Sequence, residues 1–430
     1  MNRLRTTDVV VVGGGASGVN AALAAALTGA SVTLLERSAF LGGTATGAMV
    51  AAFNGFYWHD TLVTGGTARL VLDQLEADGG GAGFKEYTAG RLTDAPLTFK
   101  VYPFDPEILK VSLDRITAAY GIQVVHHAQA VDLHGDGSGA SVVTFIGPTG
   151  QHEIGCRQVV DASANAVMAE RAGATLVAPG VHERQPMTQM MRVSGVEMER
   201  YSEVPTETRR QLVDDGIEAG EFFYRTLATS QSPANGDVFL LITAVHGHDG
   251  RDPQGLSAAE VEGRRQAFVS LDYLRRVMPG FERASLVQLA GWIGQRESVR
   301  VRALETLDGE AVRTGADHHE AISYGGGPID RHVGDSVRLA APDRPFAVPR
   351  GVLIPEGTSR LCVAGRIVGC DAGAMDGLRH MGGLMPVGQA AGTIAALAAR
   401  DGGEPADVCY ERLRSALLEH GAVLDPLRAS

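Results

Sequence analysis

Cysteine, runs of basic residues and long apolar segments are all scarce in this chain of 430 residues. Its four cysteines lie far apart, with no C-x-x-C pair and no metal-ligand spacing: Cys156, Cys362, Cys370 and Cys409. We therefore expect free thiols in a reducing compartment and no metal site. The 38 lysines and arginines are dispersed among 50 acidic residues, and the formal net charge is −12. Because no basic patch is present, a nucleic-acid partner is not expected.

The apolar run near the N-terminus, residues 9–12, is far shorter than a signal-peptide core or a membrane-spanning helix. We predict a cytoplasmic protein without a membrane span. With 44% hydrophobic residues, the chain can bury a large core, and its length suggests two domains. Abundant Gly and Ala are typical of an α/β protein in which helices pack closely on a sheet.

The first strand, turn and helix organise the rest of the chain. Four consecutive valines predict a strand buried on both faces, and Gly13, Gly15 and Gly18 follow where it must turn sharply into an Ala-rich helix. This spacing is typical of a dinucleotide-binding turn, in which the pyrophosphate meets the N-terminus of the helix. A second apolar strand ends in Glu36, whose carboxylate can accept hydrogen bonds from a ribose diol.

The segment after Glu36 resembles the FAD-dependent oxidoreductases, whose first unit continues with a basic residue and a Gly-Gly loop, here Arg37 and Gly42-Gly43. Three later blocks, residues 291–298, 361–366 and 378–392, extend this resemblance, which includes the fumarate reductase and succinate dehydrogenase flavoproteins. It implies FAD and a two-dinucleotide-binding-domain-type, Rossmann-like α/β fold. The FAD-binding domain is then discontinuous, residues 1–178 and 346–430, with a mixed α/β substrate domain inserted at 179–345.

The motifs and the resemblance together assign the FAD contacts. Val131 is placed at the adenine by resemblance, and the turn, the acidic strand end, the Gly-Gly loop and two later segments supply the others. One departure is Ala164, which stands where the family usually has Gly; it is expected to fit with a negative φ. The predicted FAD-binding residues are Gly13, Gly15, Ala16, Ser17, Gly18, Glu36, Arg37, Gly42, Gly43, Thr44, Ala45, Thr46, Val131, Ala162, Gly365, Arg366, Gly388 and Ala391.

Two further helices are predicted from their start signals. Pro386 suits the first turn of an Ala-rich helix whose N-terminus would favour negative charge at the flavin. Ser257 and Glu260 form a capping box that would begin a helix whose apolar positions include Val261, Phe268, Leu271 and Leu274.

A second dinucleotide motif is missing from the sequence. Residues 325–328, Gly-Gly-Gly-Pro, read as a loop with neither an apolar strand before it nor a helix after it. We therefore expect no separate nicotinamide-binding domain.

The candidate catalytic residues are Arg296 and Arg379 as cations and His380 as proton acceptor, provided that the pKa of His380 is ordinary. The alternative for Arg296 is a structural network with Glu297 or Arg300. The alternative for His380 is a hydrogen bond to backbone that holds its loop.

His59 is a weaker candidate base, in an aromatic patch at residues 53–59 that would either line the flavin or pack in the core. The adjacent pair His318 and His319 is expected to be exposed to solvent.

The resemblance implies oxidation of a small-molecule substrate by hydride transfer to flavin N5, with oxygen, a quinone or a carrier as electron acceptor. A flavin-dependent ene-reductase, a monooxygenase and a non-enzymatic flavin-fold binding protein are the alternatives. The intact glycine turn, Glu36 and the Gly-Gly loop disfavour the last of these. A homo-oligomer is compatible with the sequence.

Overall fold

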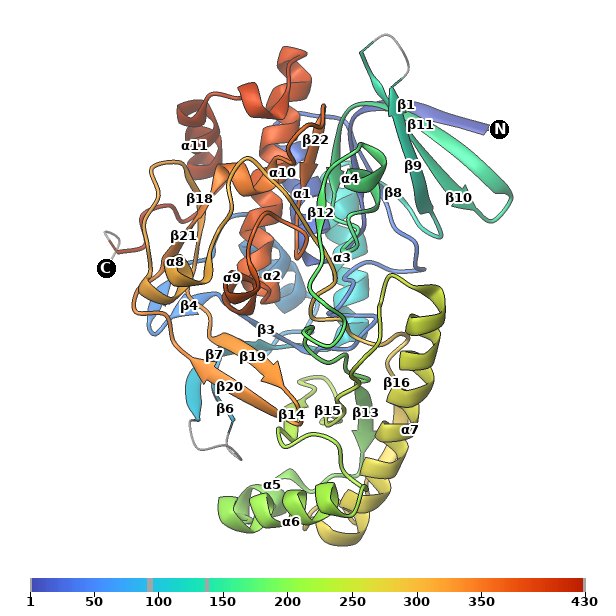
Figure 1. Cartoon of the computed structure of the whole chain (residues 1–430), viewed down its shortest axis with the longest axis vertical. Helices are drawn as coiled ribbons and strands as arrows, with labels where there is room; N and C mark the ends of the chain where they lie inside the picture. Colours follow the sequence, from blue (N-terminus) through green and yellow to red (C-terminus); the bar gives the residue numbers. More distant parts are fainter. Residues whose placement is uncertain (1, 91–95, 136–138, 428–430) are drawn as a thin grey trace.

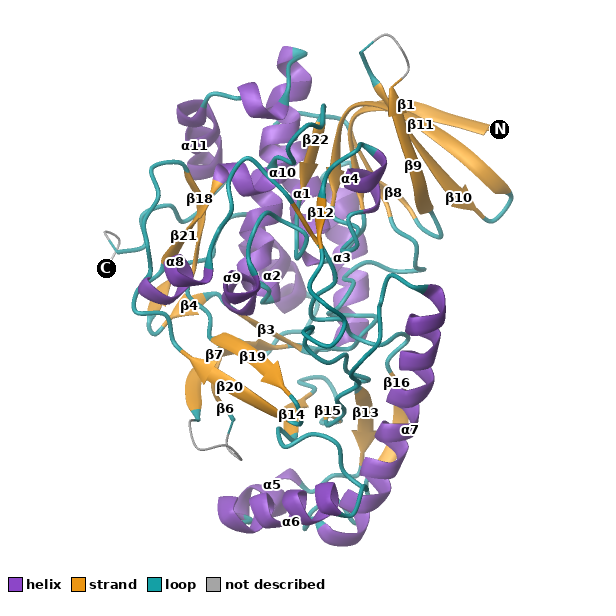
Figure 2. Ribbon diagram, in the orientation of Figure 1, coloured by secondary structure: helices purple, strands orange, loops and turns teal. Residues whose placement is uncertain are grey.

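The computed structural model describes residues 2–90, 96–135 and 139–427 (Figures 1 and 2). Its main sheet contains seven strands: β1 (Asn2–Val12), β2 (Val32–Leu35), β8 (Gln123–Val125), β9 (Gln129–Gly135), β10 (Ser141–Gly147), β11 (Gly150–Asp161) and β22 (Leu361–Val363). The strand order is β8-β2-β1-β11-β10-β9, and β22 also pairs with β11. The pairs β1–β2, β1–β11, β2–β8 and β11–β22 are parallel, which confirms the predicted α/β fold class.

Two long helices from opposite ends of the chain, α1 (Ala16–Leu27) and α10 (Met381–Asp401), lie side by side next to this sheet (Figure 1). Their contact is backbone to backbone: a Cβ on Gly388 would lie 2.1 Å from Ser17 O, and one on Gly392 would lie 2.0 Å from Ala21 O. Helix α10 is long and apolar enough to span a membrane, but its apolar stretch is wholly buried in the fold. That burial is the pattern of a core helix.

Smaller elements complete this part of the molecule. The helices are α2 (Thr67–Ala77), α3 (Pro106–Ala119), α4 (Val167–Arg171), α8 (Gly309–Thr314), α9 (Ala372–Leu378), α11 (Tyr410–Glu419) and the 3₁₀ turns η1 (Arg350–Leu353) and η2 (Pro405–Asp407). The small sheets are β3 (Ala52–Asn54) with β7 (Leu97–Pro103) and β6 (Lys85–Ala89); β4 (Tyr57–Trp58) with β5 (Thr61–Leu62); β12 (Leu176–Val177) with β17 (Arg300–Val301); β18 (Ala321–Gly325) with β21 (Phe346–Pro349); and β19 (Ile329–Val333) with β20 (Ser336–Ala340).

A second antiparallel sheet has its own apolar core. Its order is β14 (Ala228–Gln231), β15 (Val238–Leu241), β13 (Met191–Ser194) and β16 (Ser285–Leu289), and it packs with α5 (Met198–Glu203), α6 (Thr206–Glu218) and α7 (Pro253–Val277). Figure 1 shows this unit at the end of the molecule opposite β22. Val299, Val301 and Ile322, which fall within the predicted insertion, belong to the first core. The boundaries at residues 179 and 345 stay a prediction.

Helix α7 begins earlier than its capping box predicted. Asp252 is the N-cap and accepts a hydrogen bond from Gly255 N at 2.6 Å, with Pro253 in the first turn. This Asp-Pro pair supplies both a cap and a preset φ, so it outweighs the Ser257 signal. Of the apolar residues of α7, Leu271 and Leu274 are buried, whereas Val261 and Phe268 are 63% and 54% exposed.

Candidate functional site

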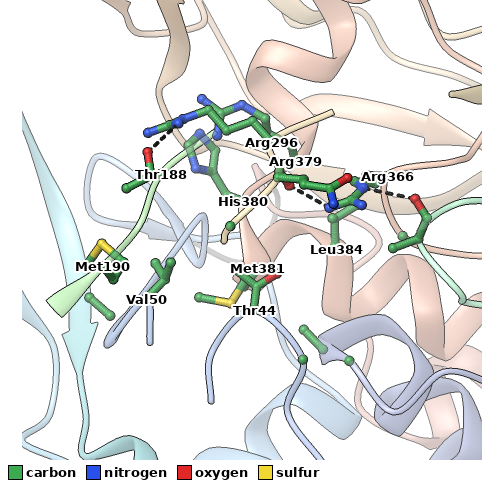
Figure 3. Close-up of a pocket in the computed structure, with 18 of the residues that line it drawn as sticks. Thr44, Val50, Thr188, Met190, Arg296, Arg366, Arg379, His380, Met381 and Leu384 are labelled. Carbon is green, nitrogen blue, oxygen red and sulfur yellow. Dashed lines mark hydrogen bonds between the residues drawn. The ribbon is translucent and has the colours of Figure 1, made fainter. Parts of the chain in front are cut away.

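A cavity of about 680 Å³ runs from the glycine turn of β1 to the second sheet (Figure 3). Of the residues predicted to bind FAD, those that line it are Gly13, Gly15, Ala16, Ser17, Gly18, Glu36, Arg37, Gly43, Thr44, Ala162, Gly365 and Arg366. The candidate catalytic residues Arg296, Arg379 and His380 line the same cavity. Segments far apart in the sequence therefore meet at one site.

The glycine turn fits a pyrophosphate. Gly13 adopts a φ of +100°, and a Cβ on Gly18 would lie 1.8 Å from Gly13 O, so both glycines are required by the protein itself. Gly15 is different: its φ is −73°, and the protein atom nearest to an added Cβ is Gly43 Cα at 4.0 Å. Neither the φ angle nor packing against other protein atoms requires glycine at position 15. The open space lies at the N-terminus of α1, where a phosphate binds favourably.

Glu36 is held in place at the cavity wall. It is 5% exposed, Gly14 N donates to its Oε2 at 2.7 Å, and Ser38 N donates to its Oε1 at 2.8 Å. The Ser38 hydroxyl also donates to Oε1, so Oε2 is the carboxylate oxygen that retains a lone pair for a ribose hydroxyl. Together with the turn, this carboxylate gives a donor and acceptor set that suits the nucleotide half of FAD.

The Gly-Gly loop lies directly against the turn. Gly42 N donates to Gly14 O at 2.8 Å, and Gly42 has a φ of +104°. Gly43 and Thr44 face the cavity, whereas Ala45 and Thr46 are buried behind it. Thr46 Oγ1 donates to Leu41 O at 2.6 Å, so Gly42, Ala45 and Thr46 shape the loop and do not line the cavity.

Three other predicted FAD contacts also lie outside the cavity. The Val131 carbonyl accepts a hydrogen bond from Arg171 Nε at 3.1 Å, and its neighbours Gln129 and Ala130 face the cavity in its place. Gly388 and Ala391 are buried in α10, where small residues are needed for the contact with α1. The sequence did not separate glycines that face a ligand from those that face a helix.

Ala164 takes the left-handed conformation that glycine favours, with a φ of +66°, so the expectation of a negative φ was wrong. Its carbonyl accepts hydrogen bonds from Ser298 Oγ at 2.9 Å and Arg366 Nε at 3.0 Å. These bonds hold the strained residue on the same path that a glycine would follow.

Arg366 connects separate segments of the cavity wall through hydrogen bonds. Besides Ala164 O it donates to Gln295 O and, at 3.3 Å, to Asn165 Oδ1. Burial and the nearby charge of Arg37 lower the pKa of Arg366 to about 10, which leaves it charged at neutral pH. Arg37 in turn lies 5.7 Å from the centre of the Trp292 ring, a cation–π contact at the cavity wall.

Helix α10 begins at Met381, five residues before Pro386, so the predicted first-turn position of this proline was wrong. A proline removes the N–H that would bond the carbonyl four residues earlier, and here Thr64 Oγ1 donates to Gly382 O at 3.4 Å. The N-terminus of α10 still reaches the cavity, through Met381 and Leu384.

The side chain of Arg296 points into the cavity, and the predicted alternative network forms without it. Glu297 and Arg300 pair with each other at 3.4 Å. Arg296 donates to Thr188 Oγ1 at 2.7 Å and to Pro186 O (Figure 3). Burial and the charge of Arg379 lower the pKa of Arg296 to about 9, so this partly exposed side chain is a cation at neutral pH.

Arg379 is the second cation, and it has a carboxylate partner. Its Nη2 donates to Asp330 O at 2.7 Å, lies 3.2 Å from Asp330 Oδ1, and donates to Gln185 Oε1 at 3.3 Å. Its Nε is buried and has no hydrogen-bond partner among the described residues. One donor is therefore left for a ligand.

His380 is fully buried, and its Nε2 donates to Pro328 O at 2.7 Å. Burial and the charge of Arg379 lower the pKa of His380 to about 4, so the expectation of an ordinary pKa was wrong. At neutral pH its Nδ1 is a hydrogen-bond acceptor and a weak base.

The other candidate base, His59, is exposed and lies outside the cavity. Phe53 and Phe56 from the same patch belong to the first core, so core packing was the correct alternative for them.

Sequence reasoning missed Asp330 and His332, which line the cavity beside Arg379. They alternate on β19, so their side chains share one face, and His332 Nε2 lies 2.8 Å from Asp330 Oδ1. His332 Nδ1 contacts the hydroxyl of Tyr224. The alternation Asp-x-His on a strand was the available signal.

The glycine-rich segment at residues 325–327 follows the buried strand β18, which corrects the expectation that no strand precedes it. It leads into β19, not into a helix, so it does not form a second dinucleotide turn. A Cβ on Gly326 would lie 2.6 Å from Trp58 Cβ, and packing therefore accounts for that glycine.

Comparison with solved structures shows the same fold in p-nitrophenol 4-monooxygenase from Pseudomonas putida, with 12% identity, a TM-score of 0.53, and coverage of 99% of this chain and 87% of that one. A geranylgeranyl bacteriochlorophyll reductase-like protein from Thermoplasma acidophilum has 13% identity, a TM-score of 0.49, and coverage of 99% and 86%. No curated protein sequence matches the chain. The family of FAD dependent oxidoreductases matches residues 8–417. The chain therefore belongs to the FAD dependent oxidoreductase family and is an FAD-dependent enzyme.

Proposed function

We propose that this enzyme oxidises a small organic substrate, which donates a hydride to flavin N5. The observation that carries the proposal is the convergence of Arg296, Arg379 and His380 on the cavity that is also lined by Gly15 and Gly43. A dehydrogenase needs cations that fix the substrate and stabilise developing negative charge, and this cavity supplies them. The suggested relationship to fumarate reductase and succinate dehydrogenase flavoproteins is consistent with this chemistry.

Side chains of this protein would bind and orient the substrate beside the flavin. FAD supplies the hydride acceptor when it is bound. Arg296 and the free Nε of Arg379 would orient an anionic group of the substrate, and the Thr188 hydroxyl would keep Arg296 in position. His380 is neutral at pH 7, so its Nδ1 would accept a hydrogen bond from the substrate. With a pKa of about 4, it would be a weak proton acceptor.

A flavin monooxygenase is the second candidate, because p-nitrophenol 4-monooxygenase shares the fold and the fold alone does not separate the two reactions. An ene-reductase would use the same groups in the reverse direction. We further propose a cytoplasmic enzyme with a substrate domain at residues 179–345, with oxygen, a quinone or a carrier reoxidising the flavin. Homo-oligomers are compatible with this proposal.

The test is anaerobic screening of small metabolites for bleaching of the bound flavin. A dehydrogenase is reduced by its substrate in the absence of oxygen and of NADH. A monooxygenase is instead reduced by a nicotinamide cofactor and consumes oxygen when the substrate is added. If rapid, saturable reduction by NADH were required before any substrate reacted, the dehydrogenase proposal would be wrong.

A further inference from the structure

Charged and titratable side chains gather at one point of the cavity. Arg296 comes from the loop after β16, Arg379 follows α9, Asp330 and His332 lie on β19, and His380 caps α10. The two arginines are cations and Asp330 is the carboxylate among them. Burial and the charge of Arg379 lower the pKa of His332 well below its ordinary value, and that of His380 is about 4. Both histidines are therefore neutral at pH 7, and the cluster has a net charge of about +1 from two cations and one anion.

Arg379 pairs directly with a carboxylate, whereas Arg296 does not. Asp330 Oδ1 lies 3.2 Å from Arg379 Nη2, while the hydrogen bonds of Arg296 go to a hydroxyl and a carbonyl. A partly buried cation without a directly paired carboxylate is costly, and an anionic ligand would lower that cost. The unpartnered Nε of Arg379 provides a second donor at the same place. Both observations indicate an anion between the two guanidinium groups.

Apolar side chains form part of the remaining lining at this end of the cavity, beside Thr226, Thr229, Ser230 and Gln231. Side chains from β15, β20 and the segment before β13 form one wall: Met190, Phe239, Leu241, Val337 and Leu339. Figure 3 draws Met190 and Val50 below Thr188, the partner of Arg296, and all three line the cavity. Lys85 and Glu86 also line the cavity, but they are exposed and of opposite sign. A ligand in this space would place an apolar body against the wall.

We propose that the site selects a substrate with a single negative charge and an apolar body, its anionic group bound by Arg296 and Arg379. The ligand's role as substrate rests on the proposed function; its binding does not. One charge neutralises the cluster. A second charge in the same place would face Asp330 without a cation to balance it, so dianions should be rejected.

The experiment uses the FAD-loaded enzyme and small aromatic probes at pH 7. Benzoate and benzamide have similar shapes and differ in charge. Phthalate and phthalamate have similar shapes and carry two charges and one. Binding is read from perturbation of the flavin absorbance and from the temperature at which flavin fluorescence is released. We expect benzoate to bind roughly tenfold or more tighter than benzamide, and phthalamate tighter than phthalate.

Three variants test which side chains cause the charge selectivity of binding. Arg296→Gln should weaken benzoate binding by about tenfold or more and leave benzamide unchanged. Arg331→Gln is the matched control, because Arg331 lies on β19, pairs with Asp376 at 3.4 Å and does not line the cavity. It removes the same charge and should change neither affinity. Asp330→Asn should raise the affinity for phthalate relative to phthalamate, since the cluster then carries about two positive charges.

Equal binding of benzoate and benzamide, or no binding of either, would overturn the proposal. Tighter binding of phthalate than of phthalamate by the unmodified enzyme would refute the count of one charge. An equal loss in Arg296→Gln and Arg331→Gln would show a general charge effect and would also count against it. Binding requires no turnover, so selective binding without flavin bleaching by any anionic metabolite would contradict the proposed function alone. Bleaching by a neutral or dianionic metabolite, without selectivity among the probes, would contradict this inference alone.

Discussion

Replacing Gly15 by valine should abolish tight FAD binding and leave the fold intact. The protein atom nearest to a Cβ at this position is 4.0 Å away, and the φ of −73° suits any residue. The added side chain would instead occupy the space in front of α1. If it displaced the pyrophosphate from two charge-assisted hydrogen bonds of about 1.5–3 kcal/mol each, the loss would be about 3–6 kcal/mol. That loss corresponds to a rise in Kd of roughly 10²–10⁴-fold.

The assay compares FAD affinity, by fluorescence titration of the apoprotein, with apoprotein melting followed by circular dichroism. Gly18→Ala should lower both the FAD affinity and the melting temperature of the apoprotein, because its Cβ would lie 1.8 Å from Gly13 O. Gly403→Val should change neither the FAD affinity nor the melting temperature, because no other protein atom lies within 4 Å of its Cβ and Gly403 does not line the cavity. Unchanged FAD affinity in Gly15→Val, or an apoprotein as unstable as that of Gly18→Ala, would refute the assignment of this turn.

Three further predictions concern single residues. Ala164→Gly should stabilise the enzyme by about 1 kcal/mol, because glycine adopts a φ of +66° without strain; a melting temperature below that of the unmodified enzyme would contradict this. Burial raises the pKa of Asp376 from 3.8 to about 6, so its ionisation should cost up to about 3 kcal/mol of folding stability as the pH rises from about 4 to 6. Asp376→Asn should remove that loss, and denaturant unfolding at both pH values measures it. His380→Gln should retain FAD, and flavin reduction should show the same pH dependence as in the unmodified enzyme from about pH 5.5 to 8, because His380 is neutral over this range. If an inflection near pH 6.5 in the unmodified enzyme disappeared in the variant, His380 would be a base with an ordinary pKa.

Local sequence patterns predicted the glycine turn and Glu36, which line the cavity. The positions of Gly13, Gly15 and Gly18 follow from the turn between a buried strand and a helix, which is set by contacts within about thirty residues. Glu36 needed only the end of the next strand. The N-cap of α3 depends on equally local contacts: Asp105 accepts a hydrogen bond from Glu107 N at 2.9 Å.

Helix starts were less certain, because one segment can carry two signals. Ser257 and Glu260 look like a capping box, yet Asp252 begins the helix and Glu260 accepts a hydrogen bond from Ile293 N at 2.8 Å. A glycine is similarly ambiguous. Gly388 allows α10 to touch α1, and only the packed structure distinguishes that role from contact with a cofactor.

The sequence by itself determined the fold class, the FAD dependent oxidoreductase family and the cofactor, because each depends on residues that are close along the chain. Only the tertiary structure decided the charges and pKa values at the end of the cavity that contains Arg296, Arg379 and His380. It brought Arg296 and Arg379 to Asp330 from separate segments, and it buried His380 so that its pKa falls to about 4. Charge balance and desolvation depend on distances through space and on exclusion of water, and neither is encoded in local sequence.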